Sequence, residues 1–338
     1  MSPQMDAANP AGRPTLTIVA PCYNEAAGIE TFYRQVREVL DAMPRIAGRI
    51  LFVDDGSTDE TLAKLDVIAA RDPGVEVYSL SRNFGHQVAL SAGLDVARGD
   101  AVLMMDSDLQ HPPSLIPELV RRWQSGFDVV SAVRNTTSGA SVVKRGTAAA
   151  FYWLINRLSD VDIVPGAADF CLLSRRAHEA LVAMPERHRF LRGMVSWIGF
   201  SRARVPFDAP ERPAGTSKYT LLKMMGLAID ALLSFSAAPM RIASRMGLLL
   251  VLPGLAYLVY VVYRYLMGHT VPGWGSTVSV LLILGGTQLV FIGLIGEYLS
   301  RIFEETKQRP LYVFKQRPAD AAAASGEPPL MAVHRARS

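Results

Sequence analysis

The chain has 338 residues, half of them hydrophobic, and a formal net charge of +4. This length allows one large domain with a smaller unit, or two domains. Because the positive charge is small, it gives little support to nucleic-acid binding. The two cysteines, Cys22 and Cys171, provide neither a disulfide framework nor the ligand spacing of a zinc site. We expect both to be reduced and buried. The first 14 residues lack the apolar segment of a secretory signal, so we expect the first domain to stay in the cytosol.

Strand and helix patterns alternate along the first part of the chain. Short apolar runs closed by turns predict strands at 15–20, 49–53, 75–80, 101–105 and 127–132. Helical periodicity predicts helices at 26–43, 57–70, 86–97 and 114–125. Ser57 and Glu60, three residues apart, predict a capping box that opens the second of these helices. This alternation favours an α/β fold, with a mostly parallel sheet and helices on both of its faces.

Acidic side chains follow two of the predicted strands. Asp106 and Asp108 leave the carboxyl end of the strand at 101–105, the edge at which open α/β sheets bind ligands. Oxygen ligands at this spacing suit Mg²⁺ or Mn²⁺, which bind through a few carboxylates and substrate phosphates. The alternative is a strand that ends in a solvated acidic turn. Asp54 and Asp55 end the strand at 49–53, and two such clusters together suggest a cleft for a nucleotide diphosphate.

A dinucleotide-binding domain is the main competing α/β fold. That fold requires Gly-x-Gly-x-x-Gly after its first strand, so that the backbone can approach a pyrophosphate. Residues 21–25 of this chain read PCYNE and contain no glycine. The sequence therefore argues against a dinucleotide-binding domain.

Four motifs occur in order along the first domain. They are VAPCYNE at 19–25, VDDGSTD at 53–59, RNFG at 82–85 and DSDLQHPP at 106–113. This ordered set resembles glycosyltransferase family 2, whose members have the GT-A nucleotide-diphospho-sugar transferase fold. Within the family the chain is most similar, from about residue 15 to residue 314, to the polyprenyl-phosphate glycosyltransferases. These include the dolichol-phosphate mannose synthases and the bactoprenol (undecaprenyl-phosphate) glucosyltransferases.

The resemblance implies two overlapping groups of binding residues. Those that would bind the nucleotide are Pro21, Tyr23, Glu25, Asp54, Asp55, Ser57 and Asp106. Those that would hold the metal are Asp106, Asp108 and Gln110, of which Asp108 also counts as catalytic.

Later motifs extend the resemblance. In ADFCLL at 168–173, Asp169 takes the position of the family's catalytic aspartate. The family usually carries Gly-Asp-Phe-Arg-Leu there, so this chain departs at Ala168 and Cys171, and residue 171 lacks the arginine's contact. Residues 212–219 (RPAGTSKY) resemble the flexible acceptor loop. Residues 187–192 (RHRFLR) also follow the family pattern, although by themselves they predict an exposed basic helix face.

The excess of hydrophobic residues lies in the last third of the chain. Residues 247–263 and 277–295 are almost uncharged, and each run with its flanks reaches the roughly 20 residues that cross a bilayer core. Buried core helices are the weaker alternative, because these runs are apolar on all sides. Arginines and lysines flank the two outer ends, whereas the loop at 269–276 has none. The positive-inside rule then predicts a C-terminal two-helix transmembrane hairpin with both ends in the cytosol.

The expected organisation has five parts. They are a disordered N-terminus (1–14), the catalytic domain (15–217), amphipathic juxtamembrane helices (218–240), two transmembrane helices (241–303) and a cytosolic tail (304–338). Apolar residues at helical spacing in 218–235 allow that segment to lie among lipid headgroups, with packing on the catalytic domain as the alternative. We expect a multi-pass protein of the inner membrane with a cytosolic catalytic domain. Since hairpin-anchored relatives are often tetramers, we also expect a homo-oligomer.

The resulting hypothesis is metal-dependent, inverting transfer of a hexose from a nucleotide-diphosphate sugar to polyprenyl phosphate. A phosphate monoester is mostly dianionic at neutral pH, so this acceptor needs cations more than it needs a general base. We therefore assign Asp169 mainly to orientation and electrostatics at the anomeric centre, with proton abstraction as the lesser role. The candidate cations for the acceptor phosphate are Arg134, Arg145, Arg212 and Lys218.

Several alternatives are open at this stage. UDP-glucose is the favoured donor because the bactoprenol branch is the closer likeness, and the others are GDP-mannose and an aminosugar nucleotide. A processive polysaccharide synthase is disfavoured because we find neither its Gln-x-x-Arg-Trp motif nor its many membrane spans. A non-catalytic nucleotide-binding membrane scaffold is disfavoured because Asp106, Asp108 and Asp169 are all present.

Overall fold

A computed structural model describes residues 12–134, 167–187, 189–207, 240, 245, 256–257, 259–268 and 273–316. The chain divides into two compact units. The first comprises Met1–Trp153, Val161–Lys218 and Pro310–Ser338, and the second comprises Leu154–Asp160 and Tyr219–Arg309.

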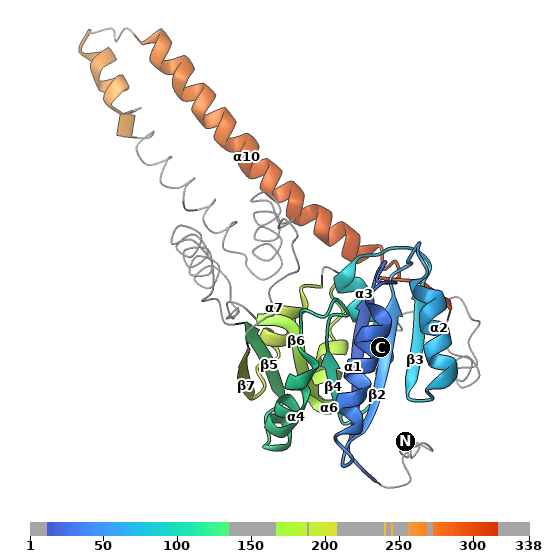
Figure 1. Cartoon of the computed structure of the whole chain (residues 1–338). Coiled ribbons are helices and arrows are strands. Elements are labelled where there is room, and N and C mark those ends of the chain that lie inside the picture. The colour runs from blue at the N-terminus through green and yellow to red at the C-terminus, as the bar shows by residue number, and fades with distance from the viewer. Residues whose placement is uncertain are drawn as a thin grey trace. The chain divides into compact units, whose positions relative to one another are not determined.

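The first unit is built on an eight-stranded sheet with the strand order β7-β5-β6-β4-β1-β2-β3-β8 (Figure 1). Its centre is the parallel set that the sequence predicted: β1 (Thr15–Cys22), β2 (Ala47–Asp54), β3 (Val75–Leu80) and β4 (Ala101–Met104). Helices cover both faces of a parallel sheet, which explains why these runs are apolar throughout rather than alternating. Because the four strands are parallel, the acidic loops after β2 and β4 leave the same edge of the sheet.

The remaining strands make the sheet mixed. β6 (Ala167–Ser174) lies antiparallel to both β4 and β5 (Val129–Arg134). β7 (Arg202–Phe207) is parallel to β5, and β8 (Phe314–Gln316) is antiparallel to β3 at the opposite edge. The sequence patterns predicted β5 but not β6, β7 or β8. The β6 strand is what carries Asp169 to the edge where the acidic loops lie.

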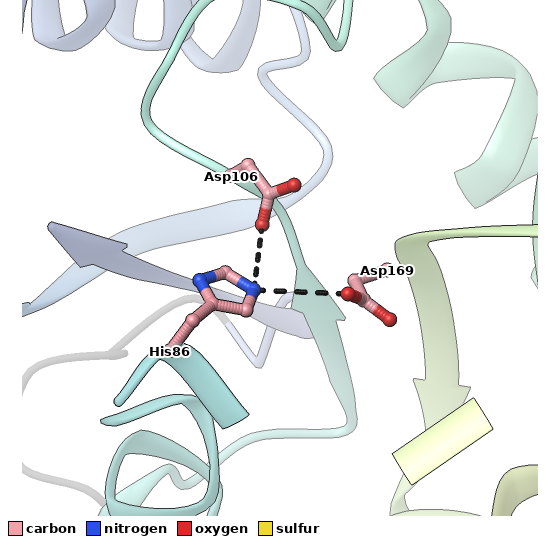
Figure 2. A group of neighbouring side chains, drawn as sticks. All are labelled: His86, Asp106 and Asp169. Atoms are coloured by element: carbon pink, nitrogen blue, oxygen red, sulfur yellow. Dashed lines mark ion pairs between the residues drawn. The ribbon is translucent and has the colours of Figure 1, made fainter. Parts of the chain in front are cut away.

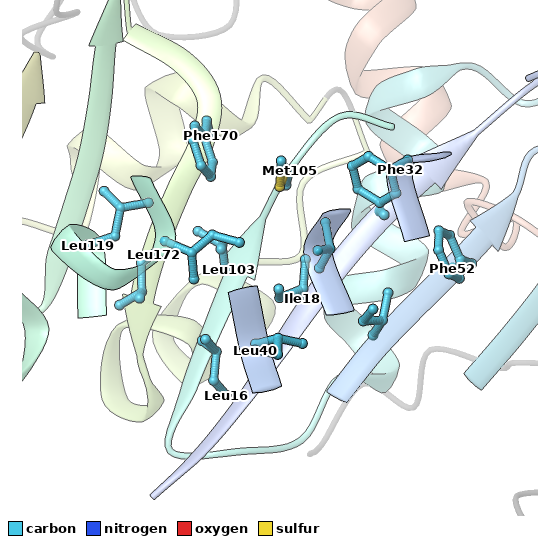
Figure 3. Packing of buried hydrophobic residues seen from close by; sticks show 14 of the residues in the cluster. Leu16, Ile18, Phe32, Leu40, Phe52, Leu103, Met105, Leu119, Phe170 and Leu172 are labelled. Atoms are coloured by element: carbon cyan, nitrogen blue, oxygen red, sulfur yellow. The ribbon is translucent and has the colours of Figure 1, made fainter. Parts of the chain in front are cut away.

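Helices pack on the sheet, and the periodicity predicted the first four of them with small shifts at their ends, but not the last two. The helices are α1 (Ile29–Asp41), α2 (Thr61–Arg71), α3 (His86–Val96), a 3-10 turn (Pro113–Leu115) followed by α4 (Ile116–Gln124), α6 (Arg175–Val182) and α7 (Leu191–Trp197). In α1 the buried residues recur every three or four positions, at Ile29, Phe32, Val36 and Leu40, which is the spacing of one helix face. Figure 3 shows part of the resulting core, in which α1 covers β1 and β2.

Helix α3 packs on the other face of the sheet and approaches it closely. A Cβ atom at Gly93 would lie 2.3 Å from Val19 Cγ1 in β1, closer than real Cβ contacts allow. The glycine at this position therefore lets the helix backbone rest directly on the strand. This packing fixes the start of α3, at His86, over the carboxyl edge of the sheet.

The predicted capping box at Ser57 and Glu60 was wrong. Helix α2 begins at Thr61, with Glu60 at the N-cap and no side-chain cap at that residue. Asp59 accepts from the Thr61 N–H instead, at 3.0 Å. Ser57 accepts a hydrogen bond from Asn24 of the preceding loop. The serine thus joins two loops instead of opening a helix.

The second unit contains α10 (Trp274–Thr306). Its stretch Ile283–Thr306 has 24 residues and a mean hydropathy of 1.4, and within the described residues it is the one helix long and apolar enough to cross a membrane. The predicted second span at 277–295 lies inside α10, although the helix continues further. Of the predicted first span, residues 256–257 and 259–263 are described and are helical.

Candidate active site

Hydrogen bonds join the loop after β1 to the loop after β2. The side-chain oxygen of Asn24, whose φ is 55°, accepts from the Thr58 N–H at 2.9 Å. The Asn24 N–H donates to Ser57 Oγ at 3.0 Å, and the Glu25 N–H donates to Thr61 Oγ1 at 2.9 Å. Asparagine adopts positive φ more readily than most residues, because its side chain can bond locally. The motifs VAPCYNE and VDDGSTD therefore form one fixed double loop.

The two carboxylates that end β2 are buried and bonded to the protein. Asp54 accepts from the Ser79 hydroxyl at 2.9 Å. Asp55 accepts from the backbone N–H groups of Phe84 and Gly85, at 2.8 and 2.9 Å. Burial raises the pKa of Asp55, and these two backbone donors oppose the rise. Asp55 thus holds the RNFG motif against the double loop, and Asp54 connects the loop to β3.

Gly56 lets these loops touch. Its φ is 67°, and a Cβ atom there would lie 2.5 Å from the carbonyl carbon of Arg82. Any other residue would strain the backbone and displace the loop at 82–85. The glycine of the VDDGSTD motif therefore has a steric role in shaping the site.

Among the described residues, Asp106, just beyond β4, has one buried carboxylate oxygen without a hydrogen-bond partner. The nearest cationic group that the structure gives this oxygen, Oδ1, is His86 Nε2 at 3.2 Å. The Asp106 N–H donates to Nδ1 of buried His111 at 3.2 Å, and the His111 ring stacks on Phe170 with centroids 5.0 Å apart. Burial lowers the pKa of His111, which favours the neutral imidazole that accepts this bond. Apart from its ion pair with His86, Asp106 Oδ1 has no partner among the described residues, so Asp106 can accept a bound cation.

Asp169 lies opposite Asp106. The antiparallel β4–β6 register pairs Met104 with Cys171, and two residues further along it brings Asp169 across from Asp106. Arg192 donates to both oxygens of Asp169, from Nε to Oδ1 at 2.7 Å and from Nη2 to Oδ2 at 3.1 Å. The cation that supports this buried carboxylate thus comes from α7, and position 171 does not supply it.

The first two residues of α3 reach the same carboxylates. His86 Nε2 lies 3.2 Å from Asp106 Oδ1 and 3.7 Å from Asp169 Oδ2 (Figure 2). Gln87 Nε2 donates to Asp169 Oδ2 at 3.2 Å. Burial lowers the pKa of His86, but the two carboxylates outweigh it and raise that pKa to about 10. Burial raises the pKa of Asp169, but His86 and Arg192 bring it well below its usual value. Two anions and two cations therefore meet at this edge of the sheet.

The second carboxylate of the Asp-x-Asp pair is held within its own loop. Gln110 donates to Asp108 twice, from Nε2 at 2.6 Å and from its backbone N–H at 3.0 Å. The Ser107 hydroxyl donates to the Pro21 carbonyl at 2.8 Å, which connects this loop to the loop after β1. Burial raises the pKa of Glu25, and the negative charge of Asp108 adds to the rise. The predicted residues Pro21, Glu25, Asp108 and Gln110 are therefore neighbours.

Two overlapping sets of residues are candidates for holding a divalent cation. Ligand atoms of His86, Asp106 and Asp169 lie within 4.8 Å of one another. The set implied by the sequence joins Asp106 to Asp108 and Gln110. Carboxylate and amide oxygens suit Mg²⁺ and Mn²⁺ better than an imidazole does. Asp106 belongs to both sets.

Of the remaining predicted site residues, the structure describes Tyr23 and Arg134. Tyr23 is 43% exposed, and Arg134 is exposed at the end of β5. Arg145, Arg212 and Lys218 lie outside the described residues. The exposed basic face predicted at 187–192 was wrong for Arg189, which is buried. Arg192 is exposed as predicted, but it also pairs with Asp169.

Sequence reasoning missed His86, Gln87 and Arg192 as site residues. His86 and Gln87 directly follow the RNFG motif, whose last two N–H groups donate to Asp55 at the same sheet edge. That position was the available signal for His86 and Gln87. Arg192 had no local signal, because it reaches Asp169 only through the packing of α7.

A mostly parallel sheet with acidic loops at one edge, a long apolar helix near the C-terminus and the following sequence matches together define the chain as a glycosyltransferase. Residues 17–181 match the model of glycosyl transferase family 2, and residues 238–302 match the GtrB C-terminal hairpin. The chain belongs to glycosyl transferase family 2, and the expected GT-A fold is confirmed.

Relatives match over most of their length. Uncharacterized glycosyltransferase YkcC of Bacillus subtilis is 40% identical over 89% of this chain and 93% of that protein. The bactoprenol glucosyl transferase of Shigella phage SfV is 40% identical over 89% of this chain and 98% of that protein. The prophage bactoprenol glucosyl transferase homolog of Escherichia coli is 39% identical over 89% and 98% of the two chains. Among solved structures, glucosyl-3-phosphoglycerate synthase of Mycobacterium tuberculosis is 22% identical with a TM-score of 0.44, over 65% of this chain and 79% of that one.

Proposed function

We propose that this enzyme transfers a hexose, with UDP-glucose as the favoured donor, to a polyprenyl phosphate such as undecaprenyl phosphate. The observation that carries the proposal is the pair Asp106 and Asp169. The two carboxylates face each other at the sheet edge that also carries the loops after β1 and β2. The relatives named bactoprenol glucosyl transferases, which match this chain almost from end to end, support the lipid acceptor.

The nucleotide end of the donor lies on the double loop of residues 19–25 and 53–59. Asp54, Asp55 and Ser57 set the shape of this loop through their hydrogen bonds. The half-exposed ring of Tyr23 offers a surface for the nucleoside, and Glu25 lies beside Asp108 at the phosphate end. Such a surface binds a nucleotide by shape and by a few polar contacts.

Asp106, Asp108 and Gln110 would hold Mg²⁺ or Mn²⁺. When bound, the ion neutralises the charge that develops on the leaving nucleoside diphosphate. In this role Asp106 contributes the buried oxygen that the described residues leave without a hydrogen bond. Gln110 keeps Asp108 oriented through its two hydrogen bonds.

Asp169 acts as a fixed anion beside the anomeric carbon. Both of its oxygens accept hydrogen bonds from Arg192, and the carboxylate is 6% exposed. A carboxylate held in this way stabilises positive charge on the sugar better than it accepts a proton. The dianionic acceptor phosphate supplies its own nucleophilic oxygen, so a single displacement with inversion follows.

The acceptor requires cations and access to a membrane. Arg134 is the described candidate for the phosphate, together with the proposed Arg145, Arg212 and Lys218. Helix α10 and the hairpin match support a membrane anchor. On this proposal the anchor is a two-helix hairpin in the inner membrane, the catalytic unit is cytosolic and the protein is a homo-oligomer.

Transfer assays on the full-length protein in detergent test this function. Radiolabelled UDP-glucose, GDP-mannose and UDP-N-acetylglucosamine are each incubated with undecaprenyl phosphate and Mn²⁺ or Mg²⁺. We expect a lipid-soluble product from one donor, lost with a chelator and in Asp108→Ala. Asp41→Asn, which removes an exposed carboxylate at the far end of α1, is the control and keeps full activity. Nucleotide binding without any lipid product would indicate the scaffold instead.

A further inference from the structure

Three separate elements meet at Asp169. The residue itself belongs to β6, Arg192 comes from the first turn of α7, and Gln87 comes from the first turn of α3. Arg192 and Gln87 both donate to the Asp169 carboxylate. The position of this carboxylate therefore depends on two helices that are far apart in the sequence.

Gln87 does more than donate to Asp169. Its side-chain oxygen, Oε1, accepts the backbone N–H of Leu191 at 3.4 Å. Leu191 is the first residue of α7, where helix N–H groups lack partners within the helix. The amide orientation follows from chemistry, because a carboxylate can only accept and a backbone N–H can only donate. One amide thus joins the catalytic carboxylate to the start of the helix that carries Arg192.

We propose that Gln87 is a positioning residue for the transfer reaction: its amide fixes Asp169 and the N-terminus of α7 in one arrangement. This proposal rests on the proposed function, since it takes Asp169 to be the anion beside the reacting sugar. Gln87 acts through Asp169 and does not itself touch the substrate. No other side-chain type of this length offers a donor and an acceptor together without a charge.

Two substitutions separate the halves of this role. Gln87→Met keeps the length of the side chain but removes both hydrogen bonds. Gln87→Glu keeps an acceptor for the Leu191 N–H but places a second negative charge against Asp169. Partners that orient a reactive group typically change activity about ten- to a hundredfold when removed. We expect both variants to lower kcat by that factor and to leave KM for the nucleotide sugar within about twofold.

Tyr312→Phe is a matched control at the other end of α3. The Tyr312 hydroxyl donates to Asp95 Oδ2 at 2.9 Å, and Arg189 also contacts Asp95, at 3.4 Å. This variant loosens the same helix without touching Asp169. We expect it to keep kcat within about twofold of the wild type while its melting temperature falls as much as that of Gln87→Met. An equal loss of kcat in Tyr312→Phe would overturn the proposal, since general loosening of α3 would then suffice.

Hydrogen exchange gives a readout that does not depend on activity. In the full-length protein, peptides that cover the start of α7 should exchange faster in Gln87→Met than in the wild type, in Gln87→Glu or in Tyr312→Phe. Unchanged exchange in Gln87→Met would refute the link to α7, and unchanged kcat in Gln87→Glu would refute the link to Asp169. Failure of the proposed function looks different: the wild type itself then forms no lipid-linked sugar, whereas the exchange result still decides whether Gln87 holds α7.

Discussion

Replacing Arg192 by methionine removes the cation that supports Asp169. The structure gives two charge-assisted hydrogen bonds, at 2.7 and 3.1 Å, to a carboxylate that is 6% exposed. Breaking a fully buried pair costs about 3–5 kcal/mol. Because the Arg192 side chain is 40% exposed, solvent screens part of this interaction, and Gln87 and His86 stay in place. We therefore expect a loss of roughly 2 kcal/mol in the free energy of unfolding.

For a unit of this size, roughly 2 kcal/mol corresponds to a fall of about 4–8 °C in melting temperature. Thermal melts in detergent measure it. Arg175→Met is the control: Arg175 pairs with Asp100 at 3.0 Å, but the two side chains are 60% and 43% exposed. Exposed pairs contribute about 0–1 kcal/mol, so this variant should lose at most about 2–4 °C, less than Arg192→Met.

The same variant tests catalysis. We expect Arg192→Met to lower kcat about a hundredfold, because Asp169 keeps its charge but loses its fixed orientation. Arg192→Lys should recover part of the stability and little of kcat, since an ammonium cannot make the bidentate contact. If Arg192→Met melted like Arg175→Met and kept the wild-type kcat, the Asp169–Arg192 pair would have no role in either property.

Three further predictions follow from other parts of the fold. The guanidinium of Arg176 is the main cause that lowers the pKa of Asp128 to about 2, so this stabilisation is complete above about pH 4 and is lost as the pH falls toward 2. Asp128→Asn should melt at a lower temperature than the wild type at about pH 7, with a smaller gap in melts at about pH 3. Gly56→Ala, which forces a contact with Arg82, should weaken UDP binding at least about tenfold by calorimetry, and unchanged affinity would show that the loop can move. Asp106→Asn should weaken Mn²⁺ binding by about tenfold or more in the presence of UDP, and equal binding would place the ion away from Asp106.

Local sequence determined the parts of this protein that need no distant partner. Apolar runs closed by turns are sufficient to predict β1 to β5, and helical spacing predicts α1 to α4 with errors of a few residues. The Asp-x-Asp pair is placed at the active edge because it directly follows a central strand. The length and apolar composition of α10 likewise mark it as a candidate membrane span without any knowledge of the rest of the chain.

Only the tertiary structure decided which side chains meet. Asp169 reaches Asp106 because β6 inserts antiparallel beside β4, and a hydrophobic pattern does not encode which strand a segment will pair with. Arg192 looked like part of a solvated basic face, yet α7 brings it to Asp169. The short strand β8 returns after α10 to pair with β3, and only its partner makes it a strand. Periodicity is a property of neighbouring residues, whereas these contacts join segments tens to hundreds of residues apart through the packing of one core.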